Sequence, residues 1–113
     1  MARISTHVLD TSKGSPAPGI AVELYFKGKL VSSALTNADG RTDAPLLNAA
    51  RIETGNYELL FRVEEYLKSS GAPLTDPPFL NDITIRFGVA DGEGNYHVPL
   101  LLAAHGYSTY RGS

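Results

Sequence analysis

The chain has 113 residues, 42% of them hydrophobic, and no cysteine, so we expect a single domain over residues 1–113 without disulfides or thiolate zinc sites. Ten lysines and arginines stand against twelve aspartates and glutamates, with no run of like charges, which argues against a nucleic-acid or membrane-surface partner. No apolar stretch is long enough for a membrane helix and none resembles a signal peptide, so the expected location is cytoplasmic.

Alternation between apolar and polar residues dominates the chain, and this period is typical of a strand with one buried face. Turn signals rich in glycine, proline, serine, asparagine and aspartate separate the alternating runs at residues 12–19, 37–40 and 91–95. The expected strands, in chain order, are residues 3–8, 20–26, 29–36, 57–63, 83–89 and 96–102. Seven or eight short strands in all predict an all-β fold, either a sandwich or a small barrel.

Residues 63–70 break the alternation and predict one short helix. Val63, Tyr66 and Leu67 stand at the spacing i, i+3 and i+4, and Gly71 follows as a stop signal. The proline-rich residues 72–78 are then expected to form a connecting loop.

The stretch at residues 98–104 is apolar at nearly every position instead of alternating. A strand that is apolar on both faces either lies at the centre of a domain or covers a contact between subunits. The sequence leaves these two interpretations open.

Three histidines, His7, His97 and His105, are the first candidates for chemistry. They lack the spacing of a helical zinc motif and no cluster of carboxylates accompanies them, so we expect no metal site. Strand parity places His7 and His97 opposite the apolar faces of their strands. From spacing alone, two surface or half-buried imidazoles are the favoured interpretation.

Arg41 and residues 107–113 are the remaining candidates. Arg41 follows the Asp39-Gly40 turn, where an arginine is usually solvated. The tail contains two tyrosines and an arginine, and its end at Ser113 places a hydroxyl beside a carboxylate. It is either a last edge strand or a tail that inserts into a site. There is no nucleophile elbow and no phosphate-binding loop.

Two stretches carry a family signature. The first is the motif His7-Val8-Leu9-Asp10, followed by Gly14, Pro16, Ala17, Ile20 and Val22. The second is the run at residues 96–102, followed by Gly106-Tyr107-Ser108-Thr109. Together they resemble the transthyretin family over residues 5–113. The resemblance implies a two-sheet, transthyretin-like (prealbumin-like) β-sandwich of seven or eight strands with one short helix.

Four features are similar to one branch of that family, namely His7, His97, the turn before Arg41 and the tail Tyr110-Arg111-Gly112-Ser113. This branch hydrolyses 5-hydroxyisourate to 2-oxo-4-hydroxy-4-carboxy-5-ureidoimidazoline during urate breakdown. The hormone-carrying branch has lysine in place of His7 and lacks this tail. The resemblance also implies a homotetramer with its sites at the dimer–dimer interface, and no metal or organic cofactor.

The same resemblance implies roles for individual residues. The histidine pair would orient and deprotonate water, Arg41 would stabilise the developing negative charge, and the tail would close the pocket. The catalytic residues are expected to be His7, Arg41, His97 and Ser113. The substrate-binding residues are expected to be His7, Arg41, Tyr110, Arg111 and Gly112.

Residues 103–105, Ala-Ala-His, depart from the family pattern, so we expect His105 to be a solvated turn residue without a catalytic role. Two other functions remain as alternatives. A carrier would bind an aromatic ligand tightly without turnover. A structural, immunoglobulin-like interaction module would leave His7, Arg41, His97 and the tail without a shared location.

Overall fold

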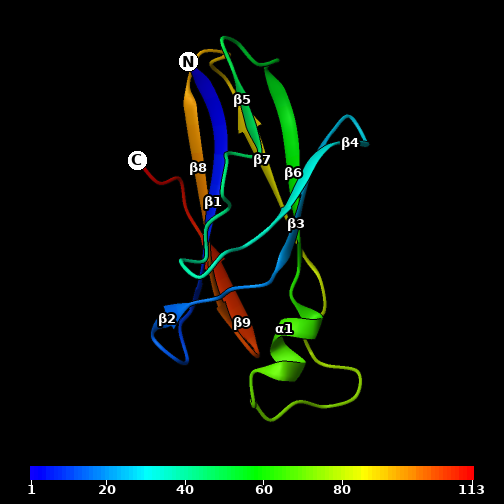
Figure 1. Ribbon diagram of the computed structural model, residues 1–113. Helices are drawn as coiled ribbons and strands as arrows, with labels where there is room; N and C mark the ends of the chain where they lie inside the picture. Colours follow the sequence, from blue (N-terminus) through cyan, green and yellow to red (C-terminus); the bar gives the residue numbers. More distant parts are fainter.

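The computed structural model describes residues 1–113 and consists of two β-sheets that face each other, with a short helix at one end (Figure 1). The elements, in chain order, are β1 (Ala2–Asp10), β2 (Ser15–Pro16), β3 (Ala21–Phe26), β4 (Lys29–Leu35), β5 (Leu47–Ala49), β6 (Gly55–Arg62), α1 (Glu64–Ser69), β7 (Ile83–Val89), β8 (Asn95–Ala103) and β9 (Gly106–Thr109).

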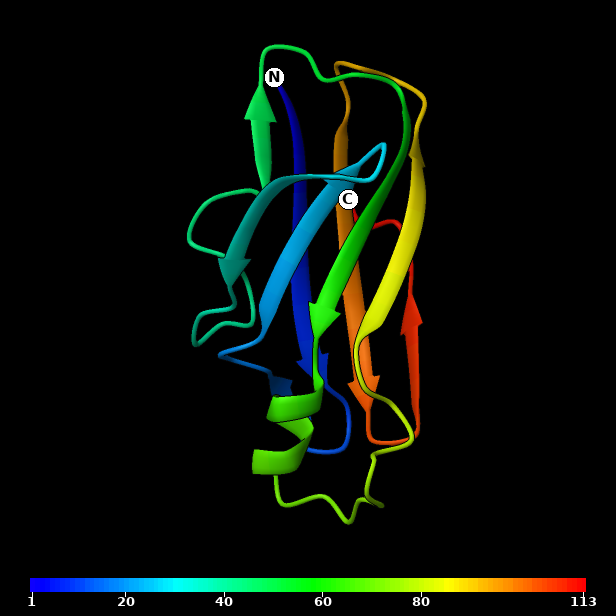
Figure 2. The same ribbon diagram turned by 90° about the vertical axis from the view of Figure 1, so that its right-hand side faces the viewer.

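The two sheets have different strand orders. The first sheet has the order β2-β1-β8-β9, and β5 also pairs with β1. The second has the order β4-β3-β6-β7 and lies in front in Figure 2. All pairs are antiparallel except β1 with β8, which run parallel at the centre of the first sheet. This parallel pair brings the beginning and the end of the chain together.

The core lies between the sheets and follows from the alternation in the sequence. In β1, Ile4 and Val8 are fully buried, whereas the residues between them are partly exposed, apart from Thr6. A cluster of 21 buried apolar residues fills the interior, and it includes Leu100 of β8 and Phe61 of β6. Each large apolar side chain removed from water contributes about 1.5 to 3 kcal/mol, so this cluster is the main source of stability.

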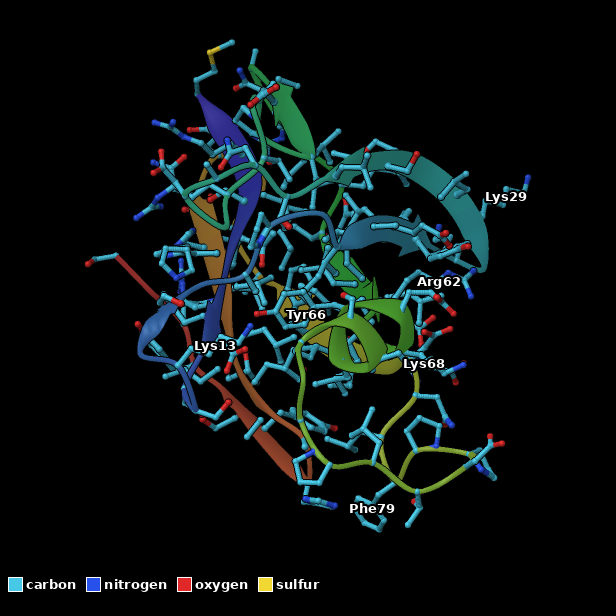
Figure 3. The ribbon with its side chains drawn as sticks, turned by 60° about the horizontal axis from the view of Figure 1, so that its bottom comes forward. Lys13, Lys29, Arg62, Tyr66, Lys68 and Phe79 are labelled. Atoms are coloured by element: carbon cyan, nitrogen blue, oxygen red, sulfur yellow. The ribbon has the colours of Figure 1, made fainter.

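The helix closes one end of the sandwich. Val63 and Leu67 are buried, and the hydroxyl of Tyr66 donates a hydrogen bond of 2.6 Å to the carboxylate of Asp10 at the end of β1. Figure 3 looks onto this end, where the Lys13 ammonium lies 5.9 Å from the centre of the Tyr66 ring. The predicted short helix at residues 63–70 is therefore confirmed, and it is not long and apolar enough to cross a membrane.

The predicted sandwich with one short helix is confirmed, and each of the six expected strands is present. The total is nine strands because β2 and β5 add two very short ones and the tail supplies β9. In the apolar run at residues 98–104, Leu100 and Leu102 face the core. Pro99 is also buried, and Leu101 is half-buried on the outer face of the sheet.

Candidate active site

A hollow of about 470 Å³ lies on the outer face of the first sheet. In β1, Arg3, Ser5 and His7 point to this face because they alternate with core residues. Asn95 and His97 reach it from β8 for the same reason. The complete lining is Arg3, Ser5, His7, Arg41, Asn95, His97, Tyr110, Gly112 and Ser113.

The parallel register between β1 and β8 determines which side chains are neighbours in the hollow. Ser5 is paired with His97, and His7 is paired with Pro99. The hydroxyl oxygen of Ser5 lies 2.9 Å from Nδ1 of His97. We did not predict Ser5 as a site residue. The available signal was its position two residues before His7 on the same strand face.

Arg41 is brought to the hollow by the tight turn before it. The side-chain oxygen of Asn37 accepts hydrogen bonds from the backbone N–H groups of Asp39, at 2.9 Å, and Arg41, at 3.2 Å. The carbonyl of Gly40 accepts the N–H of Val8, and Arg41 then forms an isolated β-bridge with His7. Gly40 has φ +75°, and a Cβ there would lie 2.3 Å from a carbonyl of β1, so only glycine fits.

The tail borders the other side of the hollow. Residues 106–109 form the edge strand β9, and the chain then runs back along β8 to the label C in Figure 1. The N–H of Gly112 donates a 2.8 Å hydrogen bond to the carbonyl of His97. Tyr110, Gly112 and Ser113 line the hollow. The tail therefore begins as an edge strand, and its last residues border the hollow.

Arg111 is the one expected site residue that does not line the hollow. Its guanidinium carbon lies 4.3 Å from the centre of the Tyr96 ring, and its Nη2 donates to the carbonyl of Asn95 at 3.2 Å. The side chain therefore attaches the tail to β8 instead of facing a ligand. His7, Arg41, His97, Tyr110, Gly112 and Ser113, by contrast, are brought together.

No carboxylate side chain lines the hollow, and its polar side chains are cationic or neutral. Neither Arg3 nor Arg41 forms an ion pair with an acidic side chain. Burial lowers the pKa of His97, and the nearby charges of Arg41 and His7 lower it further. At neutral pH His97 is therefore a neutral imidazole, which can accept a proton, beside cations that attract an oxyanion.

His105 lies away from the hollow, in the turn between β8 and β9, and is exposed as predicted. Its ring centre is 6.1 Å from that of Phe79, which Figure 3 places at the helix end of the molecule. Nowhere does the chain bring together three or more His, Asp or Glu side chains that could hold a metal ion.

The chain is similar to known proteins both in sequence and in structure. Residues 4–112 match the model of the family described as HIUase/Transthyretin. The 5-hydroxyisourate hydrolase 2 of Rhizobium meliloti (strain 1021) is 50% identical over 115 residues, which cover 98% of this chain and 96% of the relative. The solved structure of Klebsiella pneumoniae 5-hydroxyisourate hydrolase has a TM-score of 0.83 and 36% identity, and 100% of each chain is covered. A solved (S)-allantoin synthase has a TM-score of 0.91 and 38% identity over 99% of this chain, which spans 44% of the synthase.

Proposed function

Since the chain belongs to the HIUase/transthyretin family, we propose that it hydrolyses 5-hydroxyisourate to 2-oxo-4-hydroxy-4-carboxy-5-ureidoimidazoline in urate breakdown. The similarities confirm the expected family and the hydrolase class, because relatives matched over nearly the whole chain are 5-hydroxyisourate hydrolases. The observation that carries the proposal is the presence of His7, Arg41 and His97 in one hollow. A hormone-carrying protein has no need of this combination.

In the proposed reaction, a water oxygen attacks a ring carbonyl of the substrate while His97 or His7 accepts one of the water protons. A neutral imidazole with a depressed pKa is suited to accept it, and His97 has this property. The amide C–N bond of the six-membered ring then breaks, and the leaving nitrogen takes a proton back from the imidazole. Arg41 stabilises the negative charge on the carbonyl oxygen during the attack.

The tail closes the hollow around the substrate in this proposal. Tyr110 and Ser113 supply hydroxyl groups, and Gly112 lets the backbone approach His97 closely. Arg111 acts indirectly by stacking on Tyr96 and keeping the tail against β8. No metal or organic cofactor is needed for these steps.

We further propose that residues 1–113 are one domain that assembles as a homotetramer, with the hollows at the dimer–dimer interface. The apolar pair Leu9 and Leu101, adjacent on the outer face of the first sheet, supports this arrangement. Burying the same patch on each subunit of a symmetric assembly removes it from water.

The test generates 5-hydroxyisourate from urate with urate oxidase and follows its decay with and without the protein. We expect the wild type to accelerate the decay, and the His97→Asn variant to be at least about tenfold slower because it lacks an imidazole base. His105→Asn is the matched control, because this exposed histidine lies outside the hollow, and it should keep wild-type activity. Decay at the spontaneous rate with pure wild-type protein would reject the proposed function.

A further inference from the structure

The hydroxyl of Ser5 is the only side-chain hydrogen-bond partner of the His97 imidazole. The two groups come from strands whose residues are 92 positions apart, and their contact is partly buried. The Ser5 hydroxyl makes no other hydrogen bond within the chain, and Nε2 of His97 makes none. One nitrogen of the ring is therefore engaged, and the other is free beside the hollow.

The partner of one ring nitrogen decides what the other nitrogen can do. When Nδ1 carries the hydrogen and donates it to the serine oxygen, the lone pair is on Nε2, and Nε2 can act as a base. The Nδ1–H bond persists after Nε2 has been protonated, so one hydroxyl satisfies the ring before and after proton transfer. A carboxylate at position 5 would instead favour the charged imidazolium and remove the base at neutral pH.

A second contact restricts the orientation of the same ring. A Cβ built on Gly112 would lie 2.6 Å from Cδ2 of His97, so the tail backbone already packs against that edge. Ser5 on one side and Gly112 on the other leave the ring little freedom to rotate.

We propose that Ser5 is a positioning residue, whose hydroxyl accepts the Nδ1–H of His97 and thereby keeps Nε2 of that ring available to take a proton from water. The part of this proposal in which Nε2 takes a proton from water rests on the proposed function. The tautomer and the ring orientation are properties of the free protein and can be measured without substrate.

The first experiment measures the tautomer by NMR of uniformly ¹⁵N-labelled protein, at a pH where His97 is neutral. In the wild type we expect the His97 signals of an Nδ1–H imidazole. In Ser5→Ala they should move toward the Nε2–H form, which free histidine favours, and Ser5→Thr should restore the wild-type pattern. The signals of His105 serve as an internal control and should stay unchanged. An unaltered His97 tautomer in Ser5→Ala would overturn the proposal.

The second experiment measures turnover of 5-hydroxyisourate by the same variants. We expect kcat of Ser5→Ala to fall by about tenfold or more with a small change in KM, and Ser5→Thr to recover most of the loss. A wild-type kcat in Ser5→Ala would overturn the proposal even if the tautomer changed. Lack of turnover by the wild type would instead reject the proposed function, and the NMR result would then decide the proposal for Ser5. If Ser5→Ala does not fold, Ser5→Cys takes its place in both experiments and is compared with Ser5→Thr. A cysteine retains only a weak hydrogen-bond donor and acceptor.

Discussion

Gly112 makes one of the closest backbone approaches in the candidate site, because its missing side chain is what lets the tail lie on the His97 ring. A methyl group there would be 2.6 Å from Cδ2 of His97, so Gly112→Ala must displace either the tail or the ring. We expect kcat/KM for 5-hydroxyisourate to fall by at least about tenfold, because small displacements of a catalytic group are costly.

The matched control for this change is Gly106→Ala, at the start of β9. A Cβ at Gly106 meets no atom within 4 Å, so this variant should keep wild-type kcat/KM. Equal activity of the two variants would show that the close contact at Gly112 has no role in catalysis.

A second prediction for a single residue concerns the positive charge of Arg41 near His97. Arg41 is one of the causes of the lowered pKa of His97, after burial. We therefore expect Arg41→Gln to raise the pKa of His97 toward its ordinary value, measured by NMR titration of the imidazole. Arg51→Gln is the control, because Arg51 is exposed and paired with Glu93 outside the hollow. A His97 pKa unchanged in Arg41→Gln would contradict the electrostatic account of the site.

The lowered pKa of His97 also links stability to pH. Between the folded-state pKa and the unfolded value of about 6.5, the unfolded chain binds more protons at this residue than the folded chain. Protonation therefore favours unfolding, and the free energy of unfolding falls as the pH drops through about 6.5. The decline from this group ends below the folded-state pKa.

At the scale of elements, Asp10 joins the end of β1 to the following turn and to α1. One carboxylate oxygen accepts hydrogen bonds from the Ser12 hydroxyl at 2.6 Å and from the backbone N–H groups of Ser12 and Lys13. The other accepts the hydroxyl of Tyr66. Burial by itself raises the pKa of Asp10, but these hydrogen bonds outweigh it and lower the pKa below the ordinary value. The contribution of the ionised Asp10 to the free energy of unfolding is therefore present above about pH 4. It is lost as the pH falls through the folded-state pKa.

Removing the hydroxyl of Tyr66 should loosen the helix from the sandwich. Tyr66→Phe takes away a hydrogen bond to a charged acceptor, so we expect the free energy of unfolding to fall by roughly 1.5 to 3 kcal/mol. Urea denaturation at a fixed chain concentration measures it. Tyr107→Phe is the control, because the exposed Tyr107 makes no side-chain hydrogen bond. A midpoint for Tyr66→Phe equal to that of the control would show that the bond to Asp10 does not stabilise the fold.

The sequence was sufficient to predict the longer elements because most of them have a periodic pattern. Alternation identified four strands, two further strand-like runs supplied the strands at residues 29–36 and 96–102, and the i, i+3, i+4 spacing identified α1. The strands β2 and β5 were missed because two or three residues are too few to show a period. Strand order could not be read from alternation either, because a period of two states which face is buried and not which strand lies beside it.

The site was predicted only in part, because the sequence pattern does not show which strands lie side by side. Family resemblance supplied His7, Arg41, His97 and the tail, and the structure gathers them except for Arg111. Ser5 was missed because its contact with His97 depends on the register of two strands that are far apart in the sequence. The position of the Arg111 side chain on the Tyr96 ring could not be predicted either, because it depends on how the tail packs against β8.

At the scale of the whole molecule, the proposed tetramer depends on the apolar outer face of the first sheet. Leu101→Arg places a charge on this face next to Leu9, so it should break the assembly. We expect light scattering after size-exclusion chromatography to report a mass shifted from four chains toward a single chain of 12.1 kDa, with loss of activity.

Leu60→Arg is the matched control for assembly. Leu60 is also half-buried, but on the outer face of the other sheet, where its neighbours on the adjoining strands are Glu23 and Thr84. This variant should keep the mass of the wild type. A tetramer that survives Leu101→Arg would place the dimer–dimer interface elsewhere.

The parallel pairing of β1 with β8 has a consequence for how the protein is made. A ribosome adds roughly 5 to 20 residues per second, so β1 leaves it several seconds before its central partner has been synthesised. The strands β3, β4 and β6 of the second sheet are synthesised during that interval and can pair with one another, whereas β1 has no central neighbour. The hollow is therefore the last part of the fold that a nascent chain can complete, and a translation product released before β8 lacks the wall that Asn95 and His97 supply.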